Sequence, residues 1–134
     1  MGLTYAKIKL GNPRKPALKD VEVDSLVDTG AMWTCIPEHV AMQLGLEELE
    51  KREVTTADGK KHSCPYVGPI QIKFENRNCF SGAIILGDSV LLGVIQMEDM
   101  DVIVHPLKRK LMVNPENPNI AAGIVKGLKY KLIK

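Results

Sequence analysis

The sequence has few aromatic residues and few cysteines, and both shortages limit what it can build. Phe, Trp and Tyr make up 4% of the 134 residues while hydrophobic residues reach 45%, so the core must be mainly aliphatic. Its three cysteines, Cys35, Cys64 and Cys79, are odd in number and have no C-x-x-C spacing. This pattern favours reduced thiols over a disulfide framework, and we expect a cytoplasmic protein.

Further absences exclude several functional classes. A formal net charge of +2 gives no global signal for nucleic-acid binding. The first residues lack the apolar core of a signal peptide, and no apolar run reaches membrane-spanning length. P-loop, Rossmann, G-x-S-x-G and zinc-ligand spacings are missing as well. We therefore expect no cofactor and no metal ion, and neither nucleic acid nor a membrane as a partner.

The residues that are present favour many short strands separated by turns. The length fits a single domain spanning 1–134. Alternating or β-prone runs predict strands at 4–10, 21–27, 53–56, 61–66, 69–74, 80–86, 102–104 and 111–113, and the pattern of 128–132 allows one more.

One short helix interrupts this pattern. It is predicted from Pro37 to Leu44, because proline suits the first helical position and Gly45 suits the C-terminal stop. Residues 95–100 allow one or two further helical turns. The sequence therefore predicts an all-β domain, closed into a barrel, with one short helix.

The run Leu26-Val27-Asp28-Thr29-Gly30-Ala31 carries the main chemical signal. It places a carboxylate directly after a predicted strand, followed by a hydroxyl residue and a glycine. Taken alone, Asp-Thr-Gly favours an ordinary turn. Its chemical interpretation is acid–base hydrolysis, which needs a pair of carboxylates, and this run occurs once in the chain.

Further motifs, in matching order and spacing, support the chemical interpretation. With them the sequence resembles the retropepsin-like aspartic proteases, specifically their small bacterial members. The resemblance covers residues 4 to 115 approximately and leaves a C-terminal extension at 116–134. Besides the Asp28 run, it rests on Ile36-Pro37, Leu44-Gly45-Leu46, Ala57-Asp58-Gly59, Val67-Gly68-Pro69, Leu91-Leu92-Gly93 and Met97-Glu98-Asp99-Met100-Asp101.

The resemblance implies a closed acid-protease barrel that forms one lobe per protomer of a homodimer. It also implies hydrolysis of peptides or unfolded proteins by a water activated between two Asp28 carboxylates, one from each protomer. Thr29, Gly30 and Ala31 would support the catalytic loop. Leu91, Leu92 and Gly93 would pass beneath that loop, and Ala57, Asp58 and Gly59 would form the tip of a substrate flap.

Two departures from the retroviral pattern support an alternative. The flap tip carries the charged Asp58 and a single glycine, whereas retroviral tips are glycine-rich. Ala31-Met32 and Val94 occupy the places where retroviral enzymes form an ion pair between protomers. The alternative is a non-hydrolytic module that binds a peptide or protein on the same fold. A third hypothesis, an interaction factor without a cleft function, rests only on the lysine-rich C-terminal tail.

Overall fold

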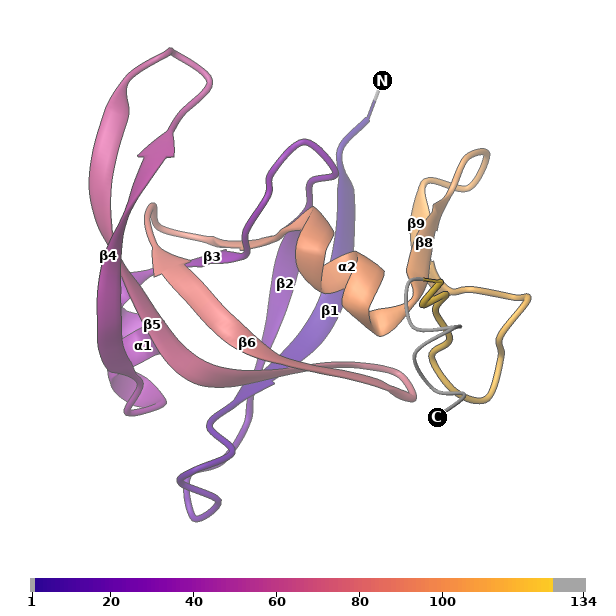
Figure 1. Cartoon of the computed structure of the whole chain (residues 1–134), viewed down its shortest axis with the longest axis horizontal. Coiled ribbons are helices and arrows are strands. Elements are labelled where there is room, and N and C mark those ends of the chain that lie inside the picture. The colour runs from indigo at the N-terminus through magenta and orange to yellow at the C-terminus, as the bar shows by residue number, and fades with distance from the viewer. Residues whose placement is uncertain (1, 127–134) are drawn as a thin grey trace.

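Strands dominate residues 2–126, the part of the chain that the computed structural model describes (Figure 1). The further strand that the pattern allows at 128–132 lies outside these residues. The strands are β1 (Thr4–Gly11), β2 (Val21–Val27), β3 (Cys35–Ile36), β4 (Glu47–Thr55), β5 (Lys61–Phe74), β6 (Arg77–Ile85), β7 (Val90–Leu92), β8 (Val102–His105) and β9 (Lys110–Val113). The helices are α1 (Glu38–Gln43) and α2 (Val94–Met100).

Six of the strands close into a barrel. They are hydrogen-bonded in the order β1-β2-β7-β3-β6-β5, and residues 9–11 of β1 pair with residues 71–73 of β5 to complete the circle. β4 extends the sheet beyond β5, while β8 and β9 form a separate hairpin. The predicted all-β class and closed barrel are confirmed.

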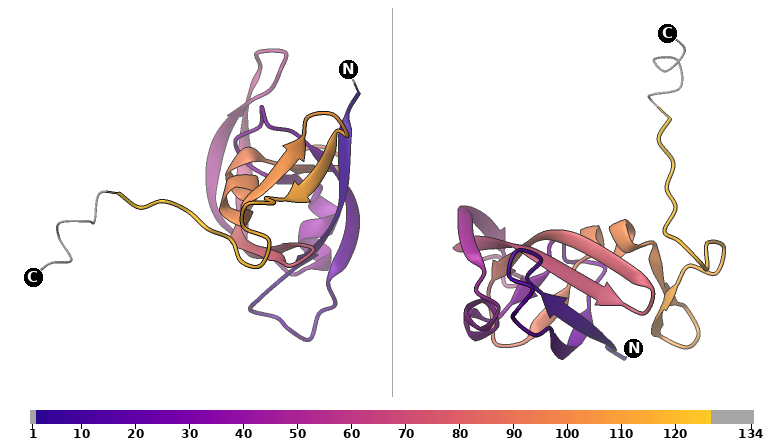
Figure 2. Two further views of the ribbon diagram at one scale, coloured as in Figure 1. Left: turned by 90° about the vertical axis from the view of Figure 1, so that its right-hand side faces the viewer. Right: turned by 90° about the horizontal axis from the view of Figure 1, so that it is seen from below.

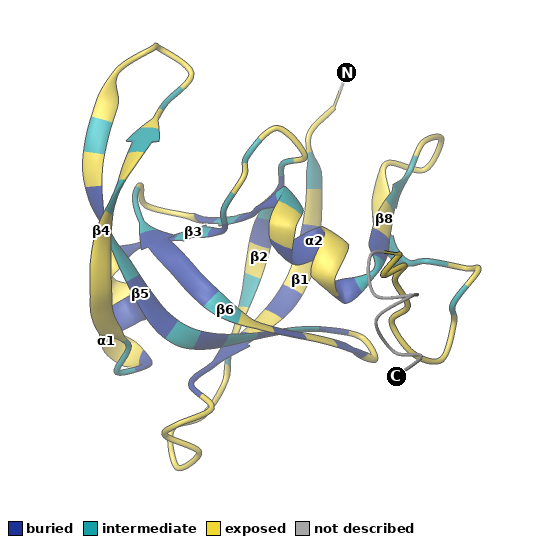
Figure 3. Ribbon diagram, in the orientation of Figure 1, coloured by how far each residue is buried: buried dark blue, intermediate teal, exposed yellow. Residues whose placement is uncertain are grey.

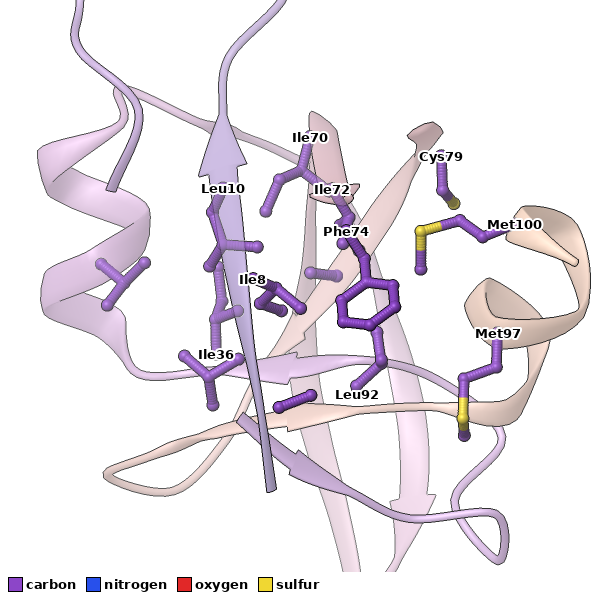
Figure 4. Packing of buried hydrophobic residues seen from close by; sticks show 14 of the residues in the cluster. Ile8, Leu10, Ile36, Ile70, Ile72, Phe74, Cys79, Leu92, Met97 and Met100 are labelled. Atoms are coloured by element: carbon purple, nitrogen blue, oxygen red, sulfur yellow. The ribbon is translucent and has the colours of Figure 1, made fainter. Parts of the chain in front are cut away.

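The barrel follows from strand alternation and encloses an aliphatic core. In β1, Ala6, Ile8 and Leu10 are buried, whereas Lys7 and Lys9 between them are exposed. The same alternation along the other barrel strands brings branched side chains together in the interior (Figure 4). Burial is concentrated on the barrel strands, and the β4–β5 hairpin that rises from them is largely exposed (Figure 3).

The structure has the predicted helix and a second one. α1 buries Val40 and Ala41 and ends before Gly45, whose φ of +62° is a conformation that glycine adopts without strain. α2 forms where the sequence allowed one or two helical turns, so the expected single helix was incomplete. It buries Gln96, Met97 and Met100 against the barrel, although no side chain caps its N-terminus.

β4 and β5 exceed the predicted strands by the most residues. The runs at 61–66 and 69–74 belong to one strand, β5, which is irregular between Val67 and Ile70, where the Gly68–Pro69 peptide is cis. β4 begins at Glu47, six residues before the predicted start at Glu53. Its first residues are mostly charged and exposed, and pairing with β5 makes them a strand.

Candidate active site

β2 delivers Asp28 to a tight turn at the open end of the barrel. The Asp28 amide donates to the Leu92 carbonyl at 3.1 Å, which continues the pairing of β2 with β7. The amide of Gly30 then donates to Asp28 Oδ1 at 2.9 Å, and the amide of Ala31 donates to the Asp28 carbonyl at 3.2 Å. Asp28 is half-buried, while Thr29 and Gly30 are exposed. The carboxylate is therefore fixed by backbone contacts and still reaches the surface.

Gly93 brings the end of β7 into close contact with the loop formed by residues 28–34, here called the Asp28 loop. A Cβ on Gly93 would lie 2.4 Å from the carbonyl carbon of Trp33 and 2.7 Å from the amide nitrogen of Thr34. Such distances exclude any side chain at this position without movement of the backbone. Just beyond it, the Val94 amide donates to the Ala31 carbonyl at 2.8 Å. The structure therefore brings Leu91-Leu92-Gly93 directly against the Asp28 loop.

A buried polar pair that sequence reasoning missed holds this junction. Thr34 and Gln96 are both fully buried. Gln96 Oε1 accepts hydrogen bonds from the Thr34 amide at 3.1 Å and from the Thr34 hydroxyl at 3.0 Å. The hydroxyl in turn accepts from the Gly93 amide at 3.1 Å. Because every one of these groups is satisfied, the pair fixes the loop without an unpaired buried donor.

The charged residue at the tip of the β4–β5 hairpin, Asp58, accepts hydrogen bonds within its own turn. Asp58 Oδ1 accepts from the Thr56 hydroxyl at 2.6 Å and from the Lys60 amide at 3.0 Å, and these contacts lower the pKa of Asp58. Gly59 has a φ of +83°, and the Thr56 amide donates to the Lys60 carbonyl at 2.9 Å. Ala57, Asp58 and Gly59 are all exposed. The Asp58 carboxylate thus shapes the turn of the hairpin.

A cavity of about 360 Å³ separates the Asp28 loop from β4. One side is formed by the loop and the other by β4, with mostly apolar side chains between them. Burial raises the pKa of the lining Cys35 thiol to about 11, and neighbouring Cys64 and Asp28 add to the rise, so this thiol is neutral near pH 7. The lining residues are Gly30, Ala31, Met32, Trp33, Cys35, Glu53, Val54, Thr55 and Ile84.

Among residues 2–126, no group of three or more His, Cys, Asp or Glu side chains is arranged to hold a metal ion. Within the same range, no helix has the length and apolar character needed to cross a membrane.

The barrel, the Asp-Thr-Gly turn and the strand beneath it define a retropepsin-like aspartic protease lobe. Residues 16–94 match the family model described as gag-polyprotein putative aspartyl protease. This match spans more than half of the sequence, and the chain belongs to that family.

Two solved structures show the same fold. EIAV protease, complexed with the inhibitor HBY-793, has a TM-score of 0.60 at 15% identity, with 73% of this chain and 88% of that chain covered. The retroviral protease-like domain of Ddi1 from Leishmania major has a TM-score of 0.54 at 12% identity, with 85% and 91% covered. No curated protein matches the sequence significantly.

The structure thus groups most of the residues that the sequence singled out. Asp28 to Ala31 lie directly on Leu91 to Gly93, and the β4–β5 hairpin, the predicted flap, rises at the same end of the barrel (Figure 1). Their roles in hydrolysis belong to the proposal that follows.

Proposed function

We propose that the protein is a homodimeric aspartic endopeptidase in which each protomer supplies one Asp28. The observation that carries this proposal is the half-buried Asp28 carboxylate, held at a backbone turn against β7 in an aspartic protease fold. The aspartic protease mechanism uses two carboxylates, and each chain offers one Asp-Thr-Gly turn.

The proposed chemistry follows from bringing two carboxylates together. Like charges at close range oppose double ionisation, so the Asp28 pair shares one proton. The ionised carboxylate takes a proton from a water molecule, which then attacks the peptide carbonyl carbon. The protonated carboxyl group donates to the carbonyl oxygen as the tetrahedral intermediate forms. The cavity between the Asp28 loop and β4 would receive a substrate side chain, and the flap would bind peptide backbone.

Exposed apolar side chains around the Asp28 loop support dimerisation at this face. Met32 and Ile95 are 57% and 45% exposed, and the Ile95 amide donates to the Met32 carbonyl at 3.2 Å. Leu3 and Leu107 are also exposed, at the chain start and at the β8–β9 turn. These two segments project at the same end of the barrel as the Asp28 loop (Figure 1). A second copy would cover apolar area there while bringing its own Asp28 to the site.

The substitution Asp28→Asn tests the proposal because it keeps the shape of the side chain and removes its acid–base chemistry. Cleavage of an unfolded protein such as denatured casein should fall by roughly a thousandfold or more, with an unchanged circular dichroism spectrum. Asp24→Asn is the matched control, since Asp24 lies on β2, the strand that leads to Asp28, and has a largely exposed side chain. Cleavage retained by Asp28→Asn would refute the proposed mechanism.

The second candidate, a non-hydrolytic peptide- or protein-binding module, is favoured by one observation. Val94 stands where retroviral enzymes carry an arginine of the ion pair that joins the protomers, and its amide bonds within its own chain to Ala31. A wild-type dimer that binds peptide but cleaves none between pH 4 and pH 7 would support this candidate.

A further inference from the structure

We propose that Arg52 is a positioning residue that holds Trp33 in place as a wall of the substrate cavity and thereby couples the flap to the Asp28 loop. The proposal rests on the proposed function only in taking this cavity as the place where a substrate side chain binds. The arrangement of Trp33, Arg52 and Tyr66, here called the arginine stack, is observed independently of any activity.

The guanidinium group of Arg52 contacts two aromatic rings from different parts of the fold. Its carbon lies 3.6 Å from the ring centroid of Tyr66 and 5.1 Å from that of Trp33. Both separations are within the range of cation–π attraction. Arg52 Nε also pairs with Glu50 Oε2 at 2.8 Å, which fixes the direction of the side chain along β4. One cation of the flap strand therefore links β5 to the Asp28 loop.

Tyr66 anchors the stack to the barrel wall. Its hydroxyl oxygen accepts a hydrogen bond from the Gly82 amide of β6 at 3.2 Å. A Cβ on Gly82 would lie 2.2 Å from a Tyr66 ring carbon, so the ring lies directly on this glycine. Since β5 and β6 are paired barrel strands, Tyr66 gives Arg52 a fixed platform. Trp33, the second ring that the cation contacts, belongs to a loop without regular structure.

The alternation of β4 places the stack beside the cavity. Arg52 and Val54 are half-buried, whereas Lys51, Glu53 and Thr55 are exposed, so Arg52 and Val54 share the inner face of the strand. Val54 and Trp33 both line the cavity. Arg52 thus lies next to the cavity wall on the same face and contacts the indole that forms part of that wall.

Because Arg52 lies beside the cavity and away from the groups that hold Asp28, its loss should affect substrate binding and not the chemical step. Asp28 is held by the carbonyl of Leu92 and by the amide of Gly30, neither of which Arg52 contacts in the described structure. Loss of the cation should therefore disturb the cavity and leave the carboxylate in position. An arginine is required because its planar group can stack on both rings, which the ammonium of a lysine cannot do.

Trp33 is the one tryptophan of the sequence, so its fluorescence reports on the stack directly. The test compares Arg52→Met, which keeps an unbranched apolar stem and removes the cation, and Arg52→Lys, which keeps the charge. Lys51→Met is the matched control, because Lys51 is the neighbouring residue, is exposed and pairs with Glu48 at 3.4 Å. For each full-length variant, acrylamide quenching of Trp33 is measured, followed by KM and kcat for a cleaved peptide.

We expect Arg52→Met to raise the quenching constant by about twofold or more and KM by roughly three- to tenfold, with kcat within about twofold of wild type. Arg52→Lys should lie between wild type and Arg52→Met, and Lys51→Met should match wild type. Quenching of Arg52→Met equal to that of Lys51→Met would overturn the proposal. So would a fall in kcat with unchanged KM.

The two proposals fail in distinguishable ways. If the wild-type protein cleaves no peptide, the proposed hydrolysis fails, while quenching still tests whether Arg52 holds Trp33. In that case, the dissociation constant for pepstatin, measured by titration of Trp33 fluorescence, is compared in place of KM. Arg52→Met should raise this constant by roughly three- to tenfold. Equal pepstatin binding by the two proteins would contradict a role of the stack in forming this cavity. If neither protein binds pepstatin, the proposed carboxylate pair fails, and equal quenching of Arg52→Met and Lys51→Met still decides against the stack.

Discussion

At Gly93, the backbone of the Asp28 loop leaves no room for a side chain. Its Cα faces the peptide between Trp33 and Thr34, and its amide donates to the Thr34 hydroxyl. A methyl group here would push β7 away from the Asp28 loop. Because Asp28 is held by the Leu92 carbonyl, one residue before Gly93, this displacement would reach the carboxylate.

Gly93→Ala should therefore destabilise the fold by roughly 1–3 kcal/mol through overpacking and should reduce cleavage as well. Urea unfolding at equilibrium measures the change in free energy. Gly123→Ala is the control, since a Cβ at Gly123 meets no atom within 4 Å. Equal stability of the two variants would show that β7 is free to move away from the loop.

The sequence predicts the place of some residues in the site and not of others. Asp28 and Gly93 belong to short motifs and were predicted to lie together. Thr34 and Gln96 were not, because their hydrogen bonds join residues 62 positions apart and follow no periodic pattern. Arg52 was missed for a similar reason, since a charged residue on an exposed strand gives no sign of the two rings that it contacts.

At the scale of elements, Asp101 ties the segment after β9 to the end of α2. Asp101 adopts a left-handed conformation with a φ of +54°. Its carboxylate accepts hydrogen bonds from Asn114 Nδ2 at 3.0 Å, from the Ala122 amide at 3.1 Å and from Asn117 Nδ2 at 2.8 Å. These bonds lower the pKa of Asp101. Beyond them the segment extends away from the barrel (Figure 2).

The attachment of this segment should depend on pH. Because the pKa of Asp101 is lowered in the folded state, its stabilising effect is fully present above the ordinary value of about 3.9 and is lost as the pH falls through the lower folded value. Hydrogen exchange of residues 114–122, corrected for intrinsic rates, should show protection at pH 6 that is lost below about pH 4.

Two substitutions check the assignment of this pH dependence. Asp101→Asn should weaken protection at pH 6 and abolish its pH dependence. Asp88→Asn, in the exposed turn before β7, should behave like the wild type. A pH profile for Asp101→Asn that matches the wild type would assign the dependence to another group.

The elements show why strand pairing outweighs local pattern in this fold. The alternating run of β2 was predicted with both boundaries and that of β1 to within one residue, because one face of each strand is buried. The start of β4 was not, since the six residues before the predicted start are mostly charged and exposed, and they form a strand through pairing with β5. α2 was predicted only as helical turns, because its buried Gln96 and uncapped start weaken the amphipathic signal.

At the scale of the whole molecule, the chain forms one lobe with one Asp-Thr-Gly turn. The barrel fixes Asp28 at an end that also carries the flap, the cavity and the exposed side chains of Met32 and Ile95. The proposed chemistry needs two carboxylates, and a single lobe supplies only Asp28 from its one Asp-Thr-Gly turn. The central claim is therefore that two copies share one site.

Subunit mixing tests this claim most directly. Wild-type protein is equilibrated with Asp28→Asn at rising ratios, and cleavage is expressed per wild-type chain. A site shared between two copies predicts a fall to about one half at equal amounts and about one quarter at a threefold excess, since mixed dimers are inactive. Mixing with Asp24→Asn should cause no loss. Activity per wild-type chain that stays constant with added Asp28→Asn would contradict a shared site.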